Sequence, residues 1–483
     1  VTVASCERHT VETVELQEGV VDPLSPLDAS FLYMERPTSA MHVGGVLIFD
    51  GEIDADAFAQ LIGERLAAVP RYRQKVREVP GWLGPPVWVD DPDFDLDYHV
   101  RRAALPGPGT ESQLRELAGR VLGRQLDRDR PLWEIYLVEG LHGPDGSARF
   151  AVISKTHHAM VDGLGSIDIG AVLLDLAPEP RETPPDDWAP RPEPSSLGLV
   201  ADALGTHLRR PWTALDTVGR AATDLRSTAG RLASTVGAMA AAARSAGRGT
   251  PTHPLNAPIS PHRRFATSAA ELDDYKAVRK AHGGTVNDVV LTVVAGVLRR
   301  WLEGRGEPVL RSTTVRAMVP VSVRARRGGK PAGNQISAVF VDLPVGDPDP
   351  VSRLATVSAT MLAHKRSGQA VGATALVGLV GLTPPTLHSL AARLTSSLSS
   401  RVFNVVVTNV PGPQFRLYAK VARMVAMYPV VPLAQGQAVS IGITSYNGGV
   451  FYGLNADRDA MADVDDLAAA LEVSLAELTE TVS

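Results

Sequence analysis

The order of apolar and polar residues predicts alternating strands and helices in the first third of the chain. Apolar residues recur at helical spacing between positions 54 and 69, which predicts an amphipathic helix. Its apolar face consists of Phe58, Leu61, Ile62, Leu66 and Val69. Apolar runs without that spacing predict strands at residues 43–49, 133–137 and 150–155. A second helix is expected at residues 165–176.

The C-terminal part of the chain shows the same mixture. A long helix is predicted at residues 286–302, with strands at residues 312–323, 336–343 and 404–409. Two more strands, at residues 439–445 and 450–454, flank Asn447-Gly448. This pair predicts a tight hairpin because Asn-Gly supplies the positive φ angles of the turn. A last helix begins near Asp463, and its leucines share one face: Leu467, Leu471, Leu475 and Leu478.

Residues 178–264 differ in composition from both flanking parts. They begin with a proline-rich, charged run that is typical of a semi-rigid linker, followed by an alanine-rich helical stretch at about 197–246. We expect one or two crossover helices here, and an amphipathic helix on a lipid surface is the alternative. The chain therefore divides into residues 22–177, 178–264 and 265–483. Because both large parts mix strands and helices, we predict an α/β (α+β mixed) fold with two halves.

Composition narrows the class of protein. The chain has 483 residues, of which 44% are apolar and 21% charged, enough for a large core and inconsistent with a disordered chain. The 48 basic and 53 acidic residues give a net charge of -5, which argues against a nucleic-acid-binding protein. The single cysteine, Cys6, excludes an intrachain disulfide and fits a reducing compartment.

Two segments bear on membrane association. Residues 1–21 lack a basic segment followed by an apolar one, so we expect no secretory signal there. The most apolar long stretch, residues 370–382, is shorter than the roughly 20 residues that span a bilayer. We therefore expect a cytoplasmic protein, with peripheral attachment to the inner membrane face or to lipid inclusions left open.

The candidate chemistry lies at the end of the predicted strand near residue 155, where His157-His158 is followed by Asp162-Gly163. A neutral imidazole, with an ordinary pKa of about 6.5, can remove a proton from an alcohol. Adjacent strand residues point to opposite faces, so only one histidine should face a substrate, and the spacing does not choose between them. Asp162 could orient an imidazole or brace the loop, and Gly163 permits a tight turn.

Two other kinds of site fit poorly. Zinc needs three or four ligands, and two adjacent histidines on one strand are badly placed to chelate it, so we predict no metal. The chain has no HExxH segment and no G-x-S-x-G nucleophile elbow, which argues against a zinc protease and a serine hydrolase.

The segment His157-His158-Ala-Met-Val-Asp162-Gly163 resembles the HHxxxDG signature of the CoA-dependent acyltransferase superfamily, which includes chloramphenicol acetyltransferase and peptide-synthetase condensation domains. Other segments, in order along most of the chain, resemble bacterial wax ester synthase/diacylglycerol acyltransferases. These segments are Pro23-Leu24-Ser25-Pro26-Leu27-Asp28, Met41-His42-Val43-Gly44, Pro131-Leu132-Trp133-Glu134, Asn287-Asp288, Val319-Pro320-Val321-Ser322-Val323-Arg324, Gly333-Asn334-Gln335 and Thr408-Asn409-Val410-Pro411-Gly412-Pro413.

The resemblance implies transfer of a long-chain acyl group from acyl-CoA to diacylglycerol, giving triacylglycerol, or to a fatty alcohol, giving a wax ester. It implies that His158 is the general base, that no covalent acyl-enzyme forms, and that acyl-CoA is a co-substrate rather than a permanently bound cofactor. Two alternatives remain: an acyltransferase for a specialised or carrier-bound alcohol, and a non-catalytic protein that coats lipid droplets. The oligomeric state is left open.

The resemblance also implies roles for the remaining site residues. His157 and Asp162 would be structural, with Asp162 paired to an arginine for which Arg324 is the candidate, a surface arginine being the alternative. For Asn287, at a helix start, we expect an N-cap or another structural role, and a donor near the developing oxyanion is the functional alternative. Asp288, the second residue of that pair, is a candidate supporting residue, and a turn is the default for Thr408-Asn409.

The fold that the resemblance implies has two chloramphenicol-acetyltransferase-like subdomains with open mixed sheets. A channel would run between them, with His158 near its middle and with acyl-CoA and the acceptor entering from opposite ends. Residues 370–382 and 386–398 could line the acceptor entrance or touch a membrane or lipid-droplet surface, or could form a pair of core helices.

Overall fold

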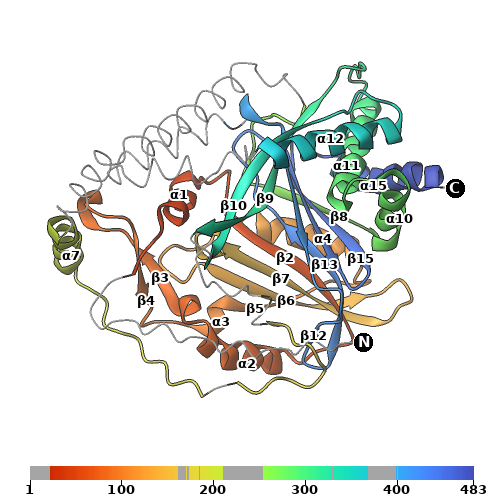
Figure 1. The fold of residues 1–483 in the computed structure, drawn as a ribbon. Coiled ribbons are helices and arrows are strands. Elements are labelled where there is room, and N and C mark those ends of the chain that lie inside the picture. The colour runs from red at the N-terminus through yellow and green to blue at the C-terminus, as the bar shows by residue number, and fades with distance from the viewer. Residues whose placement is uncertain are drawn as a thin grey trace.

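The computed structural model describes residues 22–161, 170, 173–183, 185–209, 254–327, 330–367, 399 and 401–482. Asp162, Gly163, residues 370–382 and 386–398, and most of the predicted helices at 165–176 and 197–246 lie outside these ranges. The described chain forms two six-stranded sheets and a three-stranded one (Figure 1).

The N-terminal sheet has the strand order β12-β13-β2-β7-β6-β5. Four of its strands come from the N-terminal part: β2 (His42–Asp50), β5 (Val100–Ala104), β6 (Trp133–His142) and β7 (Ala148–His157). β5 and β6 are parallel, and β6, β7 and β2 pair antiparallel. The described α-helices of residues 22–177 are α1 (Pro26–Met34), α2 (Ala55–Arg65), α3 (Leu96–His99), α4 (Glu111–Leu122) and α5 (His158–Val161). Helix α7 (Ser196–Arg209) lies in the predicted linker.

The C-terminal sheet has the order β10-β9-β11-β14-β15-β8. Its strands are β8 (Arg263–Glu271), β9 (Val315–Arg327), β10 (Lys330–Leu343), β11 (Val405–Pro411), β14 (Val439–Tyr446) and β15 (Gly449–Asp457). β11 runs parallel to both β9 and β14. Four helices gather on one side of this sheet in Figure 1: α10 (Leu272–His282), α11 (Val286–Gly304), α12 (Pro350–Ser367) and α15 (Val464–Thr479). The mixed sheets and two halves confirm the predicted α/β (α+β mixed) fold class.

Several predicted elements are confirmed where local sequence decides them. The helix predicted from position 54 begins with Asp54 as N-cap, whose side chain accepts a hydrogen bond from the Ala57 amide at 2.8 Å. The predicted hairpin is β14–β15, and its turn residues Asn447 and Gly448 have φ of 44° and 90°. The four leucines of the last helix are buried in the C-terminal core.

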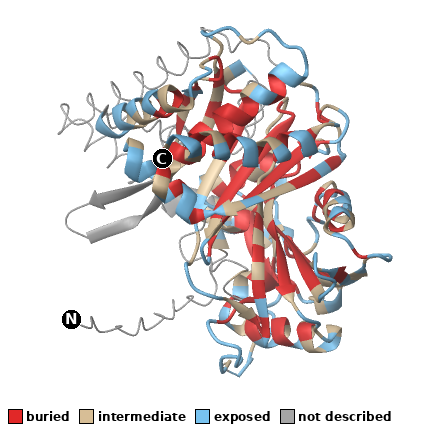
Figure 2. Ribbon diagram, turned by 90° about the vertical axis from the view of Figure 1, so that its right-hand side faces the viewer, coloured by how far each residue is buried: buried red, intermediate tan, exposed pale blue. Residues whose placement is uncertain are grey.

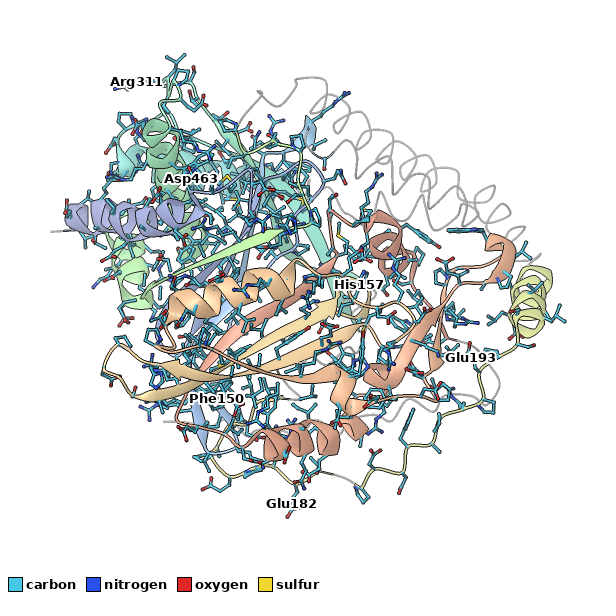
Figure 3. The ribbon with its side chains drawn as sticks, turned by 180° about the vertical axis from the view of Figure 1, so that it is seen from behind. Phe150, His157, Glu182, Glu193, Arg311 and Asp463 are labelled. Atoms are coloured by element: carbon cyan, nitrogen blue, oxygen red, sulfur yellow. The ribbon has the colours of Figure 1, made fainter. Side chains whose placement is uncertain are left out.

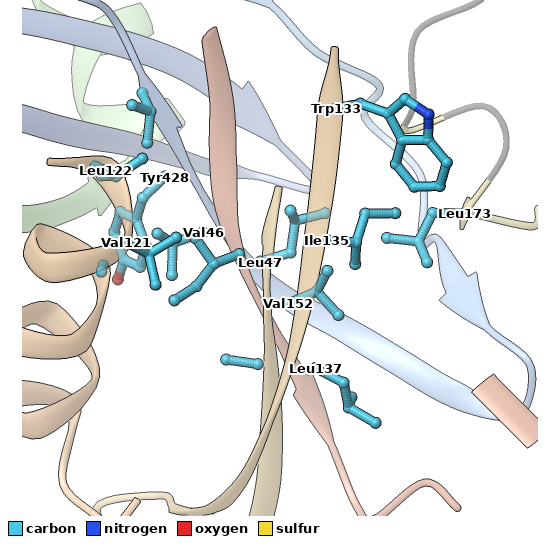
Figure 4. Close-up of a cluster of buried hydrophobic side chains, with 14 of the residues drawn as sticks. Val46, Leu47, Val121, Leu122, Trp133, Ile135, Leu137, Val152, Leu173 and Tyr428 are labelled. Carbon is cyan, nitrogen blue, oxygen red and sulfur yellow. The ribbon is translucent and has the colours of Figure 1, made fainter. Parts of the chain in front are cut away.

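Strand β13 (Ala422–Val430), together with the short β12 (Tyr418–Ala419), belongs to the C-terminal part but extends the N-terminal sheet, pairing antiparallel with β2. Tyr428 from β13 lies in the N-terminal apolar cluster with Val46 from β2 and with Val121 and Leu122 from α4 (Figure 4). The N-terminal sheet is therefore not built by residues 22–177 alone.

The two sheets approach each other closely at β13. A Cβ built on Gly453 of β15 would lie 2.0 Å from the Pro429 carbonyl oxygen, so the backbones touch where a side chain would intervene. A second link between the halves is a hydrogen bond from the Arg263 guanidinium, at the start of β8, to the Thr38 carbonyl at 2.5 Å. Buried residues run through both sheets where they meet (Figure 2). The halves are thus joined in two ways: β13 of the C-terminal part pairs within the N-terminal sheet, and the backbones of β13 and β15 pack closely.

A small sheet, ordered β1-β4-β3, flanks the N-terminal half. It consists of β1 (Asp22–Pro23), β3 (Gln74–Arg77) and β4 (Val87–Asp90), with the 3-10 turn η3 (Pro80–Trp82) between the last two. Within the described ranges, no single helix is long and apolar enough to cross a membrane. α10 and α11 pass that test only as a pair bent by 101°.

Candidate functional site

The two motif histidines lie at the junction of β7 and α5. Figure 3 shows His157 near the middle of the molecule. His157 is the last residue of β7, and its amide donates to the Leu132 carbonyl at 2.9 Å. His158 begins α5, and its amide donates to the Met41 carbonyl at 2.8 Å. The sequence predicts that the two side chains point to opposite faces of one strand. Because the strand ends at His157 and His158 is already helical, the change of backbone conformation between them sets their directions instead.

His157 is held in one protonation state. Its side chain is 1% exposed, and burial lowers its pKa to about 3, with Arg128 and His158 adding to the effect. Its Nδ1 accepts a hydrogen bond from the Ala159 amide at 3.1 Å, so the proton of the neutral ring lies on Nε2. A histidine whose basic nitrogen is already bonded to the backbone is poorly suited to accept a proton from a substrate.

His158 has a different environment. The residue is only partly buried, and its ring stacks on Phe31 with centroids 3.9 Å apart and planes 18° apart. Stacking on an aromatic face orients an imidazole while leaving its edge, with both nitrogens, away from the stacking partner. Of the two motif histidines, His158 is therefore the one whose ring can approach a substrate.

Helix α1 positions Phe31, and the segment Pro23–Asp28 explains where α1 begins. Ser25 is the N-cap, whose hydroxyl accepts from the Asp28 amide at 3.1 Å and donates to the Asp28 carboxylate at 2.7 Å. Pro26 follows at the first helical position, where its missing amide costs no hydrogen bond. The Pro23–Asp28 segment therefore forms the start of α1, the helix that places Phe31 against the ring of His158.

Glu35, at the C-terminal end of α1, and Arg128, in the loop before β6, form an ion pair next to His157. Arg128 Nη2 lies 2.8 Å from Glu35 Oε2, and Glu35 Oε1 lies 3.7 Å from His157 Nε2. The Glu35 side chain is 2% exposed. Neither residue was predicted from the sequence, since neither lies in a recognised segment. The sequence offers one indication of their role. Glu35 lies between the motifs at 23–28 and 41–44, and Arg128 lies just before the motif at 131–134.

The Pro131–Glu134 segment has a structural role around the site. Trp133 Nε1 donates to the Tyr72 carbonyl at 2.7 Å, and its ring stacks on His99. Glu134 lies opposite Lys155 on β7, whose fully buried ammonium donates to Glu134 Oε2 at 3.3 Å and to the Arg124 carbonyl at 2.8 Å. Burial lowers the pKa of Lys155, and Glu134 opposes that shift. The network fixes β6, β7 and the loop that carries Arg128.

A third histidine, His42, lies directly opposite His157 on β2. It is buried, and burial together with Lys155, His157 and Arg263 holds its pKa well below the ordinary value. The sequence places His42 within the Met41–Gly44 motif but does not mark it as a neighbour of His157. Cross-strand pairing, which depends on register, brings the two rings to the same face of the sheet.

The Asn287-Asp288 pair opens α11, but Asn287 is not its N-cap. The N-cap is Thr285, which forms a capping box with Asp288: the Asp288 amide donates to the Thr285 hydroxyl at 3.2 Å, and the Thr285 amide donates to the Asp288 carboxylate at 2.8 Å. The possible N-cap role of Asn287 is therefore wrong, because the N-cap lies two residues before Asn287 and the helix already begins at Val286.

Asn287 is instead paired with another motif residue. Asn409 Nδ2 donates to Asn287 Oδ1 at 3.1 Å, and both residues are partly buried. Asn409 and Thr408 lie within β11, so the expected turn role of Thr408-Asn409 is also wrong. The structure thus brings together two segments that the sequence presented as unrelated.

The remaining predicted site residues are described only in part. Asp162 and Gly163 lie outside the described residues. Arg324 lies on β9 opposite Asn334 of β10, with its side chain undescribed, so the Asp162–Arg324 pair stays a prediction. Within the described part of the chain, no cluster of three His, Cys, Asp or Glu residues could hold a metal ion.

Comparison with known proteins gives concordant results. Residues 24–290 match the model of the wax ester synthase/diacylglycerol acyltransferase catalytic domain, and residues 332–479 match the C-terminal domain of the same family. A probable diacylglycerol O-acyltransferase of Mycobacterium tuberculosis H37Rv, tgs1, is 33% identical over 94% of this chain and 95% of its own length. Its probable diacylglycerol O-acyltransferase tgs2 is 34% identical over 96% and 100%.

Solved structures show the same relationship. A wax ester synthase/diacylglycerol acyltransferase from Marinobacter aquaeolei VT8 matches with a TM-score of 0.65 and 29% identity, covering 95% of this chain and 99% of that one. The first condensation domain of the CDA synthetase matches with a TM-score of 0.54 and 16% identity, over 96% of each chain. The latter likeness concerns the fold alone and agrees with the two-subdomain architecture.

Proposed function

Because this chain belongs to the wax ester synthase/diacylglycerol acyltransferase family, we propose that it transfers a long-chain acyl group from acyl-CoA to diacylglycerol, and also to a fatty alcohol, with His158 as general base. The observation that carries the assignment of the base is the contrast between the two motif histidines. His157 is buried and neutral with Nδ1 bonded to Ala159, whereas His158 is partly buried and stacked on Phe31.

The proposed reaction needs one proton carrier. The imidazole of His158 takes the proton of the acceptor hydroxyl as its oxygen attacks the thioester carbonyl. The tetrahedral intermediate then collapses, the carbon–sulfur bond breaks, and the CoA thiolate receives a proton from the imidazolium. The products are an ester and free CoA, and the base returns to its neutral form without a covalent acyl-enzyme.

Asn287 is the proposed donor to the oxyanion of that intermediate. Its side-chain oxygen accepts from Asn409, which leaves the amide nitrogen as the group that can donate to a substrate. Asp162 and Arg324 are proposed to brace the loop after α5 through an ion pair.

The proposed path of the substrates is a channel between the two halves, with acyl-CoA and the acceptor entering from opposite ends. Diacylglycerol and long-chain alcohols are too apolar to be delivered in quantity through water. This chemistry supports peripheral contact of a cytoplasmic protein with a membrane or lipid-droplet surface.

The decisive experiment measures release of free CoA thiol from palmitoyl-CoA, with diacylglycerol and hexadecanol offered separately. Acceptor-dependent release by the wild type should fall at least about 100-fold in His158→Ala, the lower end of a typical general-base contribution. His262→Ala, which alters an exposed histidine, serves as the control and should match the wild type.

The other outcomes are equally informative. If the wild type releases CoA with neither acceptor, the storage-lipid assignment fails, and a specialised or carrier-bound alcohol or a non-catalytic lipid-binding role takes its place. If His158→Ala keeps wild-type rates, His158 is not the base.

A further inference from the structure

Glu35 and Arg128 form an ion pair that contacts three neighbours of His158: Met41, the Leu32 carbonyl of α1, and His157. We infer that Glu35, fixed by Arg128, is a positioning residue that sets the place and orientation of His158. The inference rests on the proposed role of His158 as base. The Glu35 carboxylate contacts three parts of the site: the Met41 amide, the Arg128 guanidinium and the His157 ring.

The first contact concerns the backbone of His158. Glu35 Oε1 accepts a hydrogen bond from the Met41 amide at 3.1 Å, and the Met41 carbonyl accepts the His158 amide at 2.8 Å. Glu35 therefore fixes the residue to which the start of α5 is bonded. A shift of Met41 would move His158 with it.

The second contact concerns the ring of His158. Arg128 donates to Glu35 Oε2 through Nε at 3.2 Å and Nη2 at 2.8 Å, and Nη2 also donates to the Leu32 carbonyl at 2.7 Å. Leu32 is the neighbour of Phe31, on which the His158 ring stacks. The ion pair thus ties the end of α1, and with it Phe31, to the loop before β6.

The third contact concerns His157. Glu35 Oε1 lies 3.7 Å from Nε2, beyond a direct hydrogen bond but close enough for an almost fully buried charge to act. A negative charge on that side favours the tautomer with hydrogen on Nε2. That tautomer leaves Nδ1 to accept the Ala159 amide, the bond that shapes the first turn of α5.

The test compares steady-state acyl transfer by Glu35→Gln, Glu35→Asp and Arg128→Gln with the wild type. Glu35→Gln keeps the size of the side chain and removes its charge, so we expect kcat to fall about 10- to 100-fold, as displaced catalytic groups do. KM for palmitoyl-CoA should stay within about twofold. Glu35→Asp keeps the charge and should recover part of the loss. Arg128→Gln tests the same contact from the half-exposed side of the pair. Because it leaves the Glu35 carboxylate buried without this cation, its melting temperature is measured together with kcat.

Asp90→Asn is the matched control. Asp90 is a buried carboxylate paired with the half-exposed Arg191, the same combination as Glu35 and Arg128, but it lies in the small sheet. If ion pairs of this kind only stabilise the fold, Asp90→Asn and Glu35→Gln should lower the melting temperature alike and leave kcat unchanged in both.

The outcomes distinguish the positioning role of Glu35 from the role of His158 as general base. Loss of kcat in Glu35→Gln and Arg128→Gln, with kcat retained in Asp90→Asn, supports the positioning role. Folded Glu35→Gln with kcat within twofold of the wild type overturns it, even if His158→Ala is inactive. Full activity of His158→Ala would instead overturn the proposed function itself.

Discussion

The two six-stranded sheets differ in what their central strands bury. Ionisable side chains are buried on β2, β6 and β7 of the N-terminal sheet: His42, Glu134, Lys155 and His157. The described centre of the C-terminal sheet is formed by apolar residues such as Val407, Ile441 and Leu454, and its buried ion pair, Arg263 with Asp457, lies at strand ends. The N-terminal sheet therefore gives up apolar packing to hold ionisable groups next to the motif histidines, while the described centre of the C-terminal sheet keeps its apolar packing.

Breaking the Lys155–Glu134 pair is the strongest test of this comparison. Lys155→Met removes the fully buried cation from Glu134, which keeps the partly exposed Arg101 at 3.4 Å. The free energy of unfolding in urea denaturation should fall by about 3 kcal/mol, the lower end of the range for a broken buried pair. The double variant Lys155→Met/Glu134→Leu should recover most of that loss, because it removes both charges from the interior.

The control for this pair is Lys276→Met, since Lys276 pairs with Asp273 on the surface of α10. Its effect should stay below about 1 kcal/mol. A similar loss in Lys155→Met and Lys276→Met would mean that the N-terminal sheet gains nothing special from its buried charges.

The seam between the sheets is the next test. Gly453→Ala places a Cβ against the Pro429 carbonyl and should destabilise the protein by about 1–3 kcal/mol, because backbone cannot move aside cheaply. Gly304→Ala, at the end of α11 with nothing within 4 Å of the new Cβ, should be neutral or slightly stabilising. Equal stability of the two variants would show that β13 is not held by this contact.

The last test is a pH dependence from His157. Its folded pKa of about 3 lies below the ordinary value, so the unfolded chain binds the additional proton as the pH falls. The stability that neutral His157 contributes is complete above about pH 6.5 and is lost progressively toward pH 3, by at most about 1.4 kcal/mol per unit.

Unfolding free energies of the wild type and His157→Gln at pH 7 and pH 5 measure this effect. The wild type should lose more stability than the variant over that interval. Some slope should remain in the variant because burial also lowers the pKa of His42 and His99. Parallel slopes in the two proteins would mean that His157 is not held neutral by burial.

Much of the fold could be predicted because its signals are local. The helix from Asp54, the Asn447-Gly448 turn and the leucine face of α15 each depend on residues a few positions apart. The pairing of β13 with β2 could not be predicted, since the apolar alternation of a strand does not say which partner it meets. The N-cap of α11 was predicted wrongly because Thr285 and Asn287 are both residue types that suit a cap. The capping box between Thr285 and Asp288 decides between them.

The sequence by itself determined the local elements, the two-part α/β character and the motif segments from which the family follows. Only the tertiary structure decided which motif histidine is buried, because burial and pKa depend on neighbours such as Arg128, which no local pattern connects to His157. The same holds for Arg128 and Glu35, 93 positions apart, and for Asn409 and Asn287, 122 positions apart. Local chemistry can be found along a chain, but the environment that selects one imidazole over its neighbour exists only after distant segments have packed together.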